Sequence, residues 1–389
     1  MRVLFTCVAL PGHLFPLVPL AWAYRALGHD VLVATSENFV PTVLRAGLPA
    51  TACGPAAGVG DLAAAGVVDP IGERGSAHRS TAQRYAHGLA FGGIARRNLP
   101  GMRSIMDSWR PDLVISERAE FAAPVAAVAR DIPRVELHWG VAPLVEYLPA
   151  VAEVLAADLA PLGLTGPPAP DAVLDPWPPS MRLPHAAGHL TMRHVPYNGD
   201  ALVPDWLLRP GDRPRVCLTL GTVLPHLGPD GVADIVLPLL DRLAGLGCEL
   251  LVAVDDKVAA TWPALPDAVR FAGRLPLSHV LAACDVSINH GGQGTALTGV
   301  GAGCPQLLLP QFDDQFDNAD AVVRAGAGVR LHAGEITPDA VARACVRLLE
   351  VPGYRRAAAA VSAELAALPA ATDVIEYLAG LTTPTELAA

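Results

Sequence analysis

The chain has 389 residues, of which 52% are hydrophobic and 17% are charged, and its formal net charge at pH 7 is −10. A chain this apolar can fill two sizeable cores, which excludes a largely disordered protein. The acidic balance, with no run of Lys or Arg, excludes a nucleic-acid-binding face, and the seven cysteines form no CxxC pair of the kind that zinc and redox motifs use.

The sequence begins with a short apolar run, residues 2–8, followed by Pro11-Gly12. Because Pro-Gly-His and then a helical pattern follow it, and not a small-residue cleavage site, this run predicts a buried strand and not a signal peptide. Pro, Gly or charged residues interrupt every apolar stretch before it reaches the roughly 20 residues of a membrane span. We therefore expect a cytoplasmic protein without a membrane partner.

The first half of the chain alternates between strand-like and helix-like patterns. After the first strand, the sequence predicts a helix over 14–27 that stops at Gly28, a helix over 119–130, and strands at 30–35, 112–117 and 133–139. Apolar runs that are buried on both faces and separated by helices indicate a parallel sheet in an α/β fold.

Two proline-rich stretches follow. Residues 140–190 predict an irregular insertion or surface excursion, and residues 195–214, rich in Pro, Gly and Asp, are typical of an interdomain linker.

A second α/β series then begins. It predicts strands at 216–221, 248–254, 269–273, 286–290 and 305–310, with helices at 230–245, 278–285, 317–325, 337–349, 353–367 and about 372–380. Two Rossmann-like halves place a cleft between them, and ligands of such sheets bind beyond the carboxyl ends of the strands.

A glycine-rich turn follows the strand that ends at His290. Gly291, Gly292 and Gly294 let the backbone approach a ligand closely, and Thr295 opens a helix whose amides and dipole suit a phosphate. The alternative is a tight strand-to-helix turn without a ligand. The next strand ends at Pro310 on the same rim, and Asp314 and Gln315 follow it. Their acceptors and amide donor suit sugar hydroxyls, the alternative being a solvated loop with a helix cap.

The first strand has a comparable turn at its end. Gly12 and His13 follow Pro11 there, so His13 is expected at the sheet rim that faces the cleft. A histidine at this place can accept a proton from a hydroxyl group, and the alternative is a capping or buried structural histidine.

The motifs PGHLFP (11–16), VPYN (195–198), LTLGT (218–222), HGGQGT (290–295) and PQFDDQFDNA (310–319) together resemble the GT-B glycosyltransferases. The chain is similar, over nearly its whole length, to the UDP-glycosyltransferase-like family that includes macrolide and aromatic polyketide glycosyltransferases. The resemblance implies an acceptor-binding Rossmann-like domain over 1–200, a facing nucleotide-sugar-binding domain over 212–369, and a last helix at about 370–389 that packs back on the first domain.

The resemblance also assigns the donor site. It implies that His290, Gly292, Gly294 and Thr295 contact the diphosphate, and that Asp314 and Gln315 hold the sugar. Gly221 and Thr222 would meet phosphate from the other side, while Arg274 and Leu275 would border the nucleobase, unless they form a plain loop. Gly12 and Gly291 complete the expected donor-binding residues.

The family's inverting members place their catalytic base at the position of His13. They often carry Asp at the end of the strand that here ends in Glu117. The longer Glu117 is expected to orient His13, although it could instead bind the acceptor, act as the base, or be a solvated strand-end residue. Phe15, Phe91 and Trp139 are candidate acceptor contacts, with plain core packing as the alternative.

The implied reaction is an inverting transfer of a sugar, with a TDP-deoxysugar favoured over a UDP-sugar, to an aromatic or macrolide natural product. No Asp-x-Asp triplet and no His/carboxylate cluster with metal-ligand spacing appears in the sequence, so we expect no metal and no cofactor, and amide dipoles to meet the leaving-group charge. The chain would act as a monomer or homodimer, and O- and C-glycosidic products both stay open.

Two other functions compete. A nucleotide-sugar 2-epimerase shares the two-domain shape but needs more acidic residues around the sugar, and a non-catalytic partner of another transferase is expected to lose the donor motif. An NAD dehydrogenase is disfavoured because the first turn lacks GxGxxG.

Overall fold

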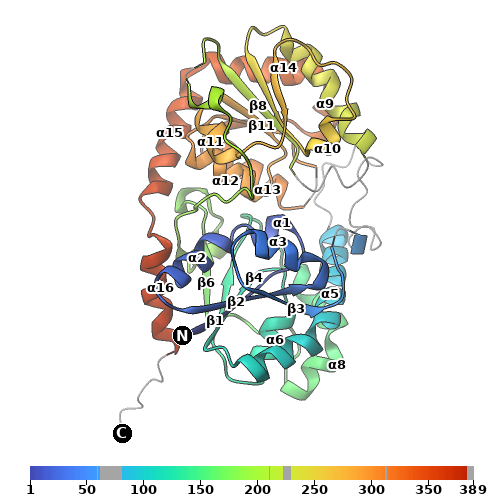
Figure 1. Ribbon diagram of the computed structural model, residues 1–389, viewed down its shortest axis with the longest axis vertical. Coiled ribbons are helices and arrows are strands. Elements are labelled where there is room, and N and C mark those ends of the chain that lie inside the picture. The colour runs from blue at the N-terminus through green and yellow to red at the C-terminus, as the bar shows by residue number, and fades with distance from the viewer. Residues whose placement is uncertain (59, 62–80, 210, 222–228, 312, 383–389) are drawn as a thin grey trace.

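The computed structural model describes residues 1–58, 60–61, 81–209, 211–221, 229–311 and 313–382, which form two α/β halves stacked end to end (Figure 1). Each half is built on a parallel sheet. The N-terminal sheet has the order β3-β2-β1-β4-β5-β6-β7 and the C-terminal sheet the order β10-β9-β8-β11-β12-β13. In both sheets, the first three strands are added toward one edge and the later strands toward the other, so the order changes direction between the first strand and the fourth. This is the doubly wound arrangement, which opens a ligand crevice at the strand ends.

The N-terminal sheet is buried on both faces because its strands alternate apolar side chains between two cores. In β1 (Arg2–Thr6), Leu4 packs in the core cluster that includes the long helix α5 (Thr81–Trp109). Val3 and Phe5 pack in the core cluster on the opposite face of the sheet. The strands are β1 (Arg2–Thr6), β2 (Asp30–Ser36), β3 (Ala50–Gly54), β4 (Leu113–Glu117), β5 (Arg134–Leu137), β6 (Ala172–Asp175) and β7 (Leu190–Thr191).

The C-terminal sheet follows the same rule. In β8, Val216 and Leu218 join one core and Cys217 the other. Its strands are β8 (Arg215–Thr219), β9 (Glu249–Ala253), β10 (Val269–Gly273), β11 (Val286–Asn289), β12 (Gln306–Leu308) and β13 (Gly328–Arg330).

Helices cover both faces of both sheets (Figure 1). In the N-terminal half they are α1 (Pro11–Leu14), α2 (Val18–Ala26), α3 (Val40–Arg45), α5 (Thr81–Trp109), α6 (Ala122–Val128), α7 (Tyr147–Val154) and α8 (Ala156–Leu159). In the C-terminal half they are α9 (Pro229–Ala244), α10 (Asp256–Ala259), α11 (Leu277–Ala282), α12 (Gln293–Gly301), α13 (Gln315–Arg324), α14 (Pro338–Glu350) and α15 (Pro352–Ala366).

Two sequence expectations were wrong in detail. The helix expected over 14–27 begins only at Val18, because Pro16 has no N–H with which to continue the turn from α1, whereas Pro19 lies in the first turn of α2, where proline is tolerated. Residues 140–190 are not simply an insertion, since β6 and β7 extend the sheet beyond β5 and α7 packs against α5.

The last helices join the two halves. α15 packs against α12, and α16 (Ala371–Ala379) packs against α2 of the N-terminal half. The stretch Pro352–Thr382 has the length and mean hydropathy of a membrane-crossing helix. It is nevertheless divided between α15 and α16, and the buried apolar residues of these two helices belong to core clusters.

The segment that enters α16 also touches Arg193, just before the interdomain linker. The backbone N–H of Arg193 donates to the carbonyl of Pro369 at 2.8 Å, and the Arg193 guanidinium donates to the carbonyl of Ala366 at 3.3 Å. The two connections between the halves therefore lie against each other.

Candidate active site

His13 and Glu117 meet at the rim of the N-terminal sheet. His13 lies in α1, just after β1, and Glu117 is the last residue of β4, which pairs with β1. The distance from His13 Nδ1 to Glu117 Oε1 is 3.0 Å, and the two side chains are 13% and 1% exposed. The contact has the length of an ion pair without the alignment of a linear hydrogen bond. A solvated strand-end role for Glu117 is therefore wrong.

The Glu117 carboxylate is fixed by several donors. Its Oε1 accepts the backbone N–H of Val8 at 3.1 Å, and its Oε2 accepts Ala119 N–H at 2.8 Å and Trp139 Nε1–H at 2.6 Å. Burial alone would raise the pKa of Glu117, but the charge of His13 and these hydrogen bonds outweigh it and lower the pKa. An ionised carboxylate beside Nδ1 keeps the proton on that nitrogen, which makes Nε2 the basic atom of His13.

Two predicted acceptor contacts surround His13. The centroid of its ring is 4.9 Å from that of Trp139 and 5.7 Å from that of Phe91 in α5. Trp139 thus borders the imidazole and also binds the carboxylate that orients it. Phe15 lies apart from this cluster and packs edge-on against Tyr197 of the linker, with 5.1 Å between the ring centroids.

The glycine-rich turn lies between β11 and α12. The imidazole of His290 fills the space between Gly221 and Gly292, where an added Cβ would lie 2.4 Å and 2.3 Å from its ring atoms. Gly291 has a φ of +81°, a backbone conformation that favours glycine. Side chains at 221 and 292 would therefore displace the histidine.

The His290 imidazole is neutral. Burial lowers the pKa of His290 to about 4, and its Nδ1 has no hydrogen-bond partner among the described residues. It can consequently offer a ligand a hydrogen bond, but not a fixed charge. Thr295 is buried in the first turn of α12, while a Cβ at Gly294 would meet open space.

Asp314 and Gln315 lie at the start of α13. Burial, followed by the charge of the neighbouring Asp313, raises the pKa of Asp314 to about 7. Asp314 Oδ2 accepts Asn318 Nδ2–H at 2.7 Å and abuts Gly140 of the other half. The Gln315 side-chain oxygen accepts the backbone N–H of Gln311 at 2.9 Å. These contacts disfavour the alternative of a solvated loop, because Asp314 and Gln315 are hydrogen-bonded within the protein.

Asn318 was not among the expected site residues. Its amide donates to Gly291 O at 3.0 Å as well as to Asp314, and its carbonyl accepts the backbone N–H of Val141 at 2.9 Å. One side chain thus joins the glycine-rich turn, the Asp314 loop and the N-terminal half. In the sequence, Asn318 is only a polar position within an expected helix, so nothing there indicated these contacts.

A second interdomain contact was also missed. Arg84 and His87 of α5 and Tyr147 of α7 bind Asp313 and Asp317 of the other half, and we call these five residues the clasp. Sequence spacing gives no sign of it, because the partners lie far apart in the chain.

The remaining predicted donor-binding residues differ in burial and in their contacts. Gly221 follows β8 with a φ of +77°, Gly12 is exposed in α1, and Thr222 lies outside the described residues. The backbone N–H of Arg274 donates to Asp256 at 2.7 Å, and its exposed guanidinium lies 3.6 Å from Asp200. The side chain of Leu275 is buried in a core cluster.

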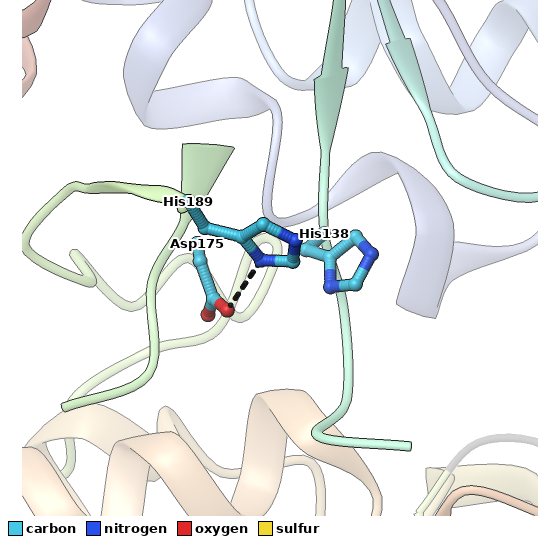
Figure 2. Close-up of side chains that lie close together, drawn as sticks. All are labelled: His138, Asp175 and His189. Atoms are coloured by element: carbon cyan, nitrogen blue, oxygen red, sulfur yellow. Dashed lines mark hydrogen bonds and ion pairs between the residues drawn. The ribbon is translucent and has the colours of Figure 1, made fainter. Parts of the chain in front are cut away.

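Among the described residues, one group of side chains could hold a metal. His138, Asp175 and His189 place their ligand atoms within 4.8 Å of one another (Figure 2). The sequence showed no such spacing because the three residues come from three separate segments.

Comparison with family models gives two matches that cover most of the chain. The N-terminal domain of erythromycin biosynthesis protein CIII-like proteins matches residues 22–221, and the C-terminal domain of the same family matches residues 238–381.

Named relatives match almost end to end. The chain is 43% identical to the L-demethylnoviosyl transferase of Streptomyces niveus, over 94% of this chain and 97% of that protein. It is 36% identical to the elloramycin glycosyltransferase of Streptomyces olivaceus, over 97% of each chain.

Solved structures of glycosyltransferases are similar to this chain over almost its whole length. The glycosyltransferase SsfS6 of Streptomyces sp. SF2575, complexed with thymidine diphosphate, superposes with a TM-score of 0.82 at 36% identity, covering 98% of this chain and 99% of that one. The spinosyn rhamnosyltransferase SpnG gives a TM-score of 0.85 at 30% identity, covering 97% and 100%, and has been solved with thymidine diphosphate and with spinosyn aglycone.

Proposed function

Because the chain belongs to the erythromycin biosynthesis protein CIII-like family and is a glycosyltransferase of GT-B fold, we propose that it moves a deoxysugar from TDP to an aromatic or macrolide natural product. The relatives that support this donor include a glycosyltransferase and a rhamnosyltransferase solved with thymidine diphosphate. Those that support the acceptor include the elloramycin enzyme and the complex with spinosyn aglycone.

The observation that carries the mechanism is the buried His13–Glu117 pair. The ionised Glu117 holds the proton on Nδ1 of His13, and Nε2 removes the proton of an acceptor hydroxyl group. The oxygen then attacks the anomeric carbon from the face opposite the diphosphate, and the bond between that carbon and the diphosphate oxygen breaks through an oxocarbenium-like state. The product has inverted configuration, and TDP leaves.

Negative charge also develops on the departing diphosphate, and the protein must stabilise it. The amides of the glycine-rich turn and of the first turn of α12 meet this charge, together with a hydrogen bond from the neutral His290. No metal ion takes part at the diphosphate in this proposal. We further propose that the enzyme works in the cytoplasm, without a cofactor, as a monomer or homodimer.

The competing functions find less support. An activator without catalysis has no use for an imidazole whose tautomer is fixed by a buried carboxylate. A 2-epimerase is not supported, because the named relatives are glycosyltransferases.

The test is calorimetric titration of the purified protein with TDP and with UDP in EDTA, on the wild type, His290→Ala and the matched control His279→Ala. His279 is an exposed histidine of the same half. We expect micromolar binding of TDP, weaker binding of UDP, a loss of at least tenfold in His290→Ala, and no change in His279→Ala. Tighter binding of UDP would overturn the thymidine assignment, and equal binding by His290→Ala would overturn the donor site.

A transfer assay with TDP-sugars tests the chemistry separately. His13→Ala should bind TDP like the wild type and lose turnover by about 100-fold or more, as expected for a missing general base. Unchanged turnover would refute the role of His13.

A further inference from the structure

Three side chains converge beside β5, β6 and β7 of the N-terminal sheet. His138 directly follows β5, Asp175 is the last residue of β6, and His189 directly precedes β7. The strands bring them together because β6 pairs with both neighbours and Leu190 lies opposite Leu174. Figure 2 shows the ring of His189 between the Asp175 carboxylate and the ring of His138.

His138 offers a nitrogen whose partner is missing. Its Nε2 lies 3.2 Å from the Glu136 carboxylate, and its Nδ1 is buried without a hydrogen-bond partner among the described residues. A buried orphan nitrogen is costly and rare, so it calls for an explanation. The carboxylate on the opposite nitrogen is the arrangement that fixes the tautomer of metal-binding histidines and directs the other lone pair to the metal.

The Asp175 carboxylate has one oxygen, Oδ2, that faces the two histidines and could bind an ion. Its Oδ1 accepts the backbone N–H of Trp177 at 3.0 Å, which fixes the carboxylate and leaves Oδ2 toward His189 Nδ1 at 3.1 Å. Arg182 Nε also lies 3.5 Å from Oδ2, but its guanidinium is held by the carbonyls of Asp175 and Trp177 at 2.7 Å and 2.8 Å. The arginine is thus anchored by the backbone and is not required as the partner of Oδ2.

A third histidine, His185, lies near His138 and His189. The ring centroids lie 4.6 Å apart for His138 and His189, 5.8 Å for His185 and His189, and 6.1 Å for His138 and His185. With Zn–N bonds of roughly 2.0–2.1 Å, imidazoles around a tetrahedral ion have centroids about 5 Å apart. The observed spacings bracket this value, and His185 is exposed and can move inward.

We propose that His138, Asp175 and His189, with His185 completing the coordination, bind one zinc-type divalent ion. Imidazole nitrogens with one carboxylate favour Zn²⁺, Co²⁺ or Ni²⁺ over Mg²⁺ and Ca²⁺, which prefer oxygen ligands. The ion ties the ends of β5 and β6 to the segment before β7. Trp139, the next residue after His138, donates to Glu117, so the ion anchors the chain beside the catalytic pair.

The experiment uses full-length protein purified without metal-affinity steps and stripped with a chelator. Titration with Co²⁺ should give intense tetrahedral ligand-field bands that saturate at one ion per chain, and Zn²⁺ should displace it. Zn²⁺ should also raise the Tm of the wild type, because an ion that binds only the folded state stabilises it.

Variants decide whether these residues are the ligands. His189→Ala and Asp175→Asn should abolish the Co²⁺ bands, and Glu136→Gln should weaken Zn²⁺ binding by about 10–100-fold. The control His279→Ala, an exposed histidine of the other half, should behave like the wild type. Absence of saturable binding, six-coordinate bands, or wild-type binding by His189→Ala and Asp175→Asn would each overturn the site.

Two further measurements keep the outcome unambiguous. If Asp175→Asn does not fold, the comparison of His189→Ala with the wild type decides whether these residues bind the ion. His189 is half-buried, so its replacement is better tolerated. TDP titration of the same stripped samples reports on the donor site, which contains none of these residues. Failure of metal binding with intact TDP binding overturns only the metal site, and the reverse overturns only the proposed donor site.

Discussion

His87 of α5 binds Asp313 of the opposite half, with 2.7 Å between His87 Nδ1 and the carboxylate. Tyr147 donates to the same oxygen at 2.5 Å, and Arg84 approaches Asp313 at 3.4 Å and Asp317 at 2.6 Å. Burial raises the pKa of Asp313, but the contacts with His87, Tyr147 and Arg84 outweigh it and lower the pKa. The residue next to Asp314 is therefore an ionised anchor that holds the two halves together.

Asp313→Asn should weaken the clasp while sparing the backbone. Asp313 has a φ of +49°, which Asn tolerates better than most residues, so the variant mainly removes the charge. Losing charge-assisted bonds in a buried site costs about 2–3 kcal/mol. We expect a lower Tm and a higher donor KM, measured by calorimetry and initial rates. The control Asp339→Asn alters an exposed pair with Arg242 and should change neither quantity. A variant with wild-type Tm and KM would show that the clasp does not hold the halves closed.

Glu117→Gln should separate orientation of His13 from donor binding. The amide cannot stabilise the proton on His13 Nδ1 as the ionised carboxylate does, so kcat should fall by about 10²–10⁴-fold. TDP affinity should not change, because Glu117 lies in the other half of the molecule. The measurement is kcat against pH at saturating donor. Partial rescue by Glu117→Asp would support a positioning role, whereas an unchanged kcat and pH profile in Glu117→Gln would contradict it.

Asp314 makes stability depend on pH in a definite direction. Between its ordinary pKa of 3.8 and about 7, the folded chain keeps a proton that the unfolded chain releases. The contribution of Asp314 to stability therefore falls as the pH rises through this window. Asp314→Asn should raise the Tm more at pH 8 than at pH 5 and should also impair transfer, if the carboxylate binds sugar hydroxyls. An equal shift of Tm at both pH values would contradict the raised pKa.

Gly292→Ala should damage the donor site without unfolding the protein. The added Cβ lies 2.3 Å from His290 Nε2, so the imidazole must move. We expect TDP affinity to fall by tenfold or more in a titration. Gly301→Ala, at the far end of the same helix, makes only an ordinary 3.5 Å contact with Leu365 and should stabilise α12 by up to about 1 kcal/mol. Equal TDP affinity in the two variants would exclude a role for the His290 position.

The sequence predicted most strands of both sheets, because apolar runs of strand length alternate with helical patterns. It also placed His13, Glu117 and His290 at strand ends, since these positions follow directly from where the apolar runs stop. The long helix α5 was missed. Its interior contains Pro100 and several glycines, and Gly88 and Gly101 are there because Tyr147 and the carbonyl of Cys53 pack too close for a Cβ.

Contacts between distant segments could not be predicted. Asn318 contacts Val141, and Arg84 contacts Asp317, only because the two halves meet face to face. The same holds for His138, Asp175 and His189, which β5, β6 and β7 bring together. Local patterns specify elements and their ends, whereas these pairs depend on how the elements are assembled.

The contact between Arg193 and Pro369 has a mechanical consequence. Because both chain crossings between the halves begin side by side there, the covalent chain limits how far the halves can separate on that flank. The helix α5, which carries Arg84 and His87 of the clasp, lies across the molecule from α15 and α16 (Figure 1). We therefore expect any opening of the halves to break the clasp, whose contacts are noncovalent, while the two chain crossings stay joined.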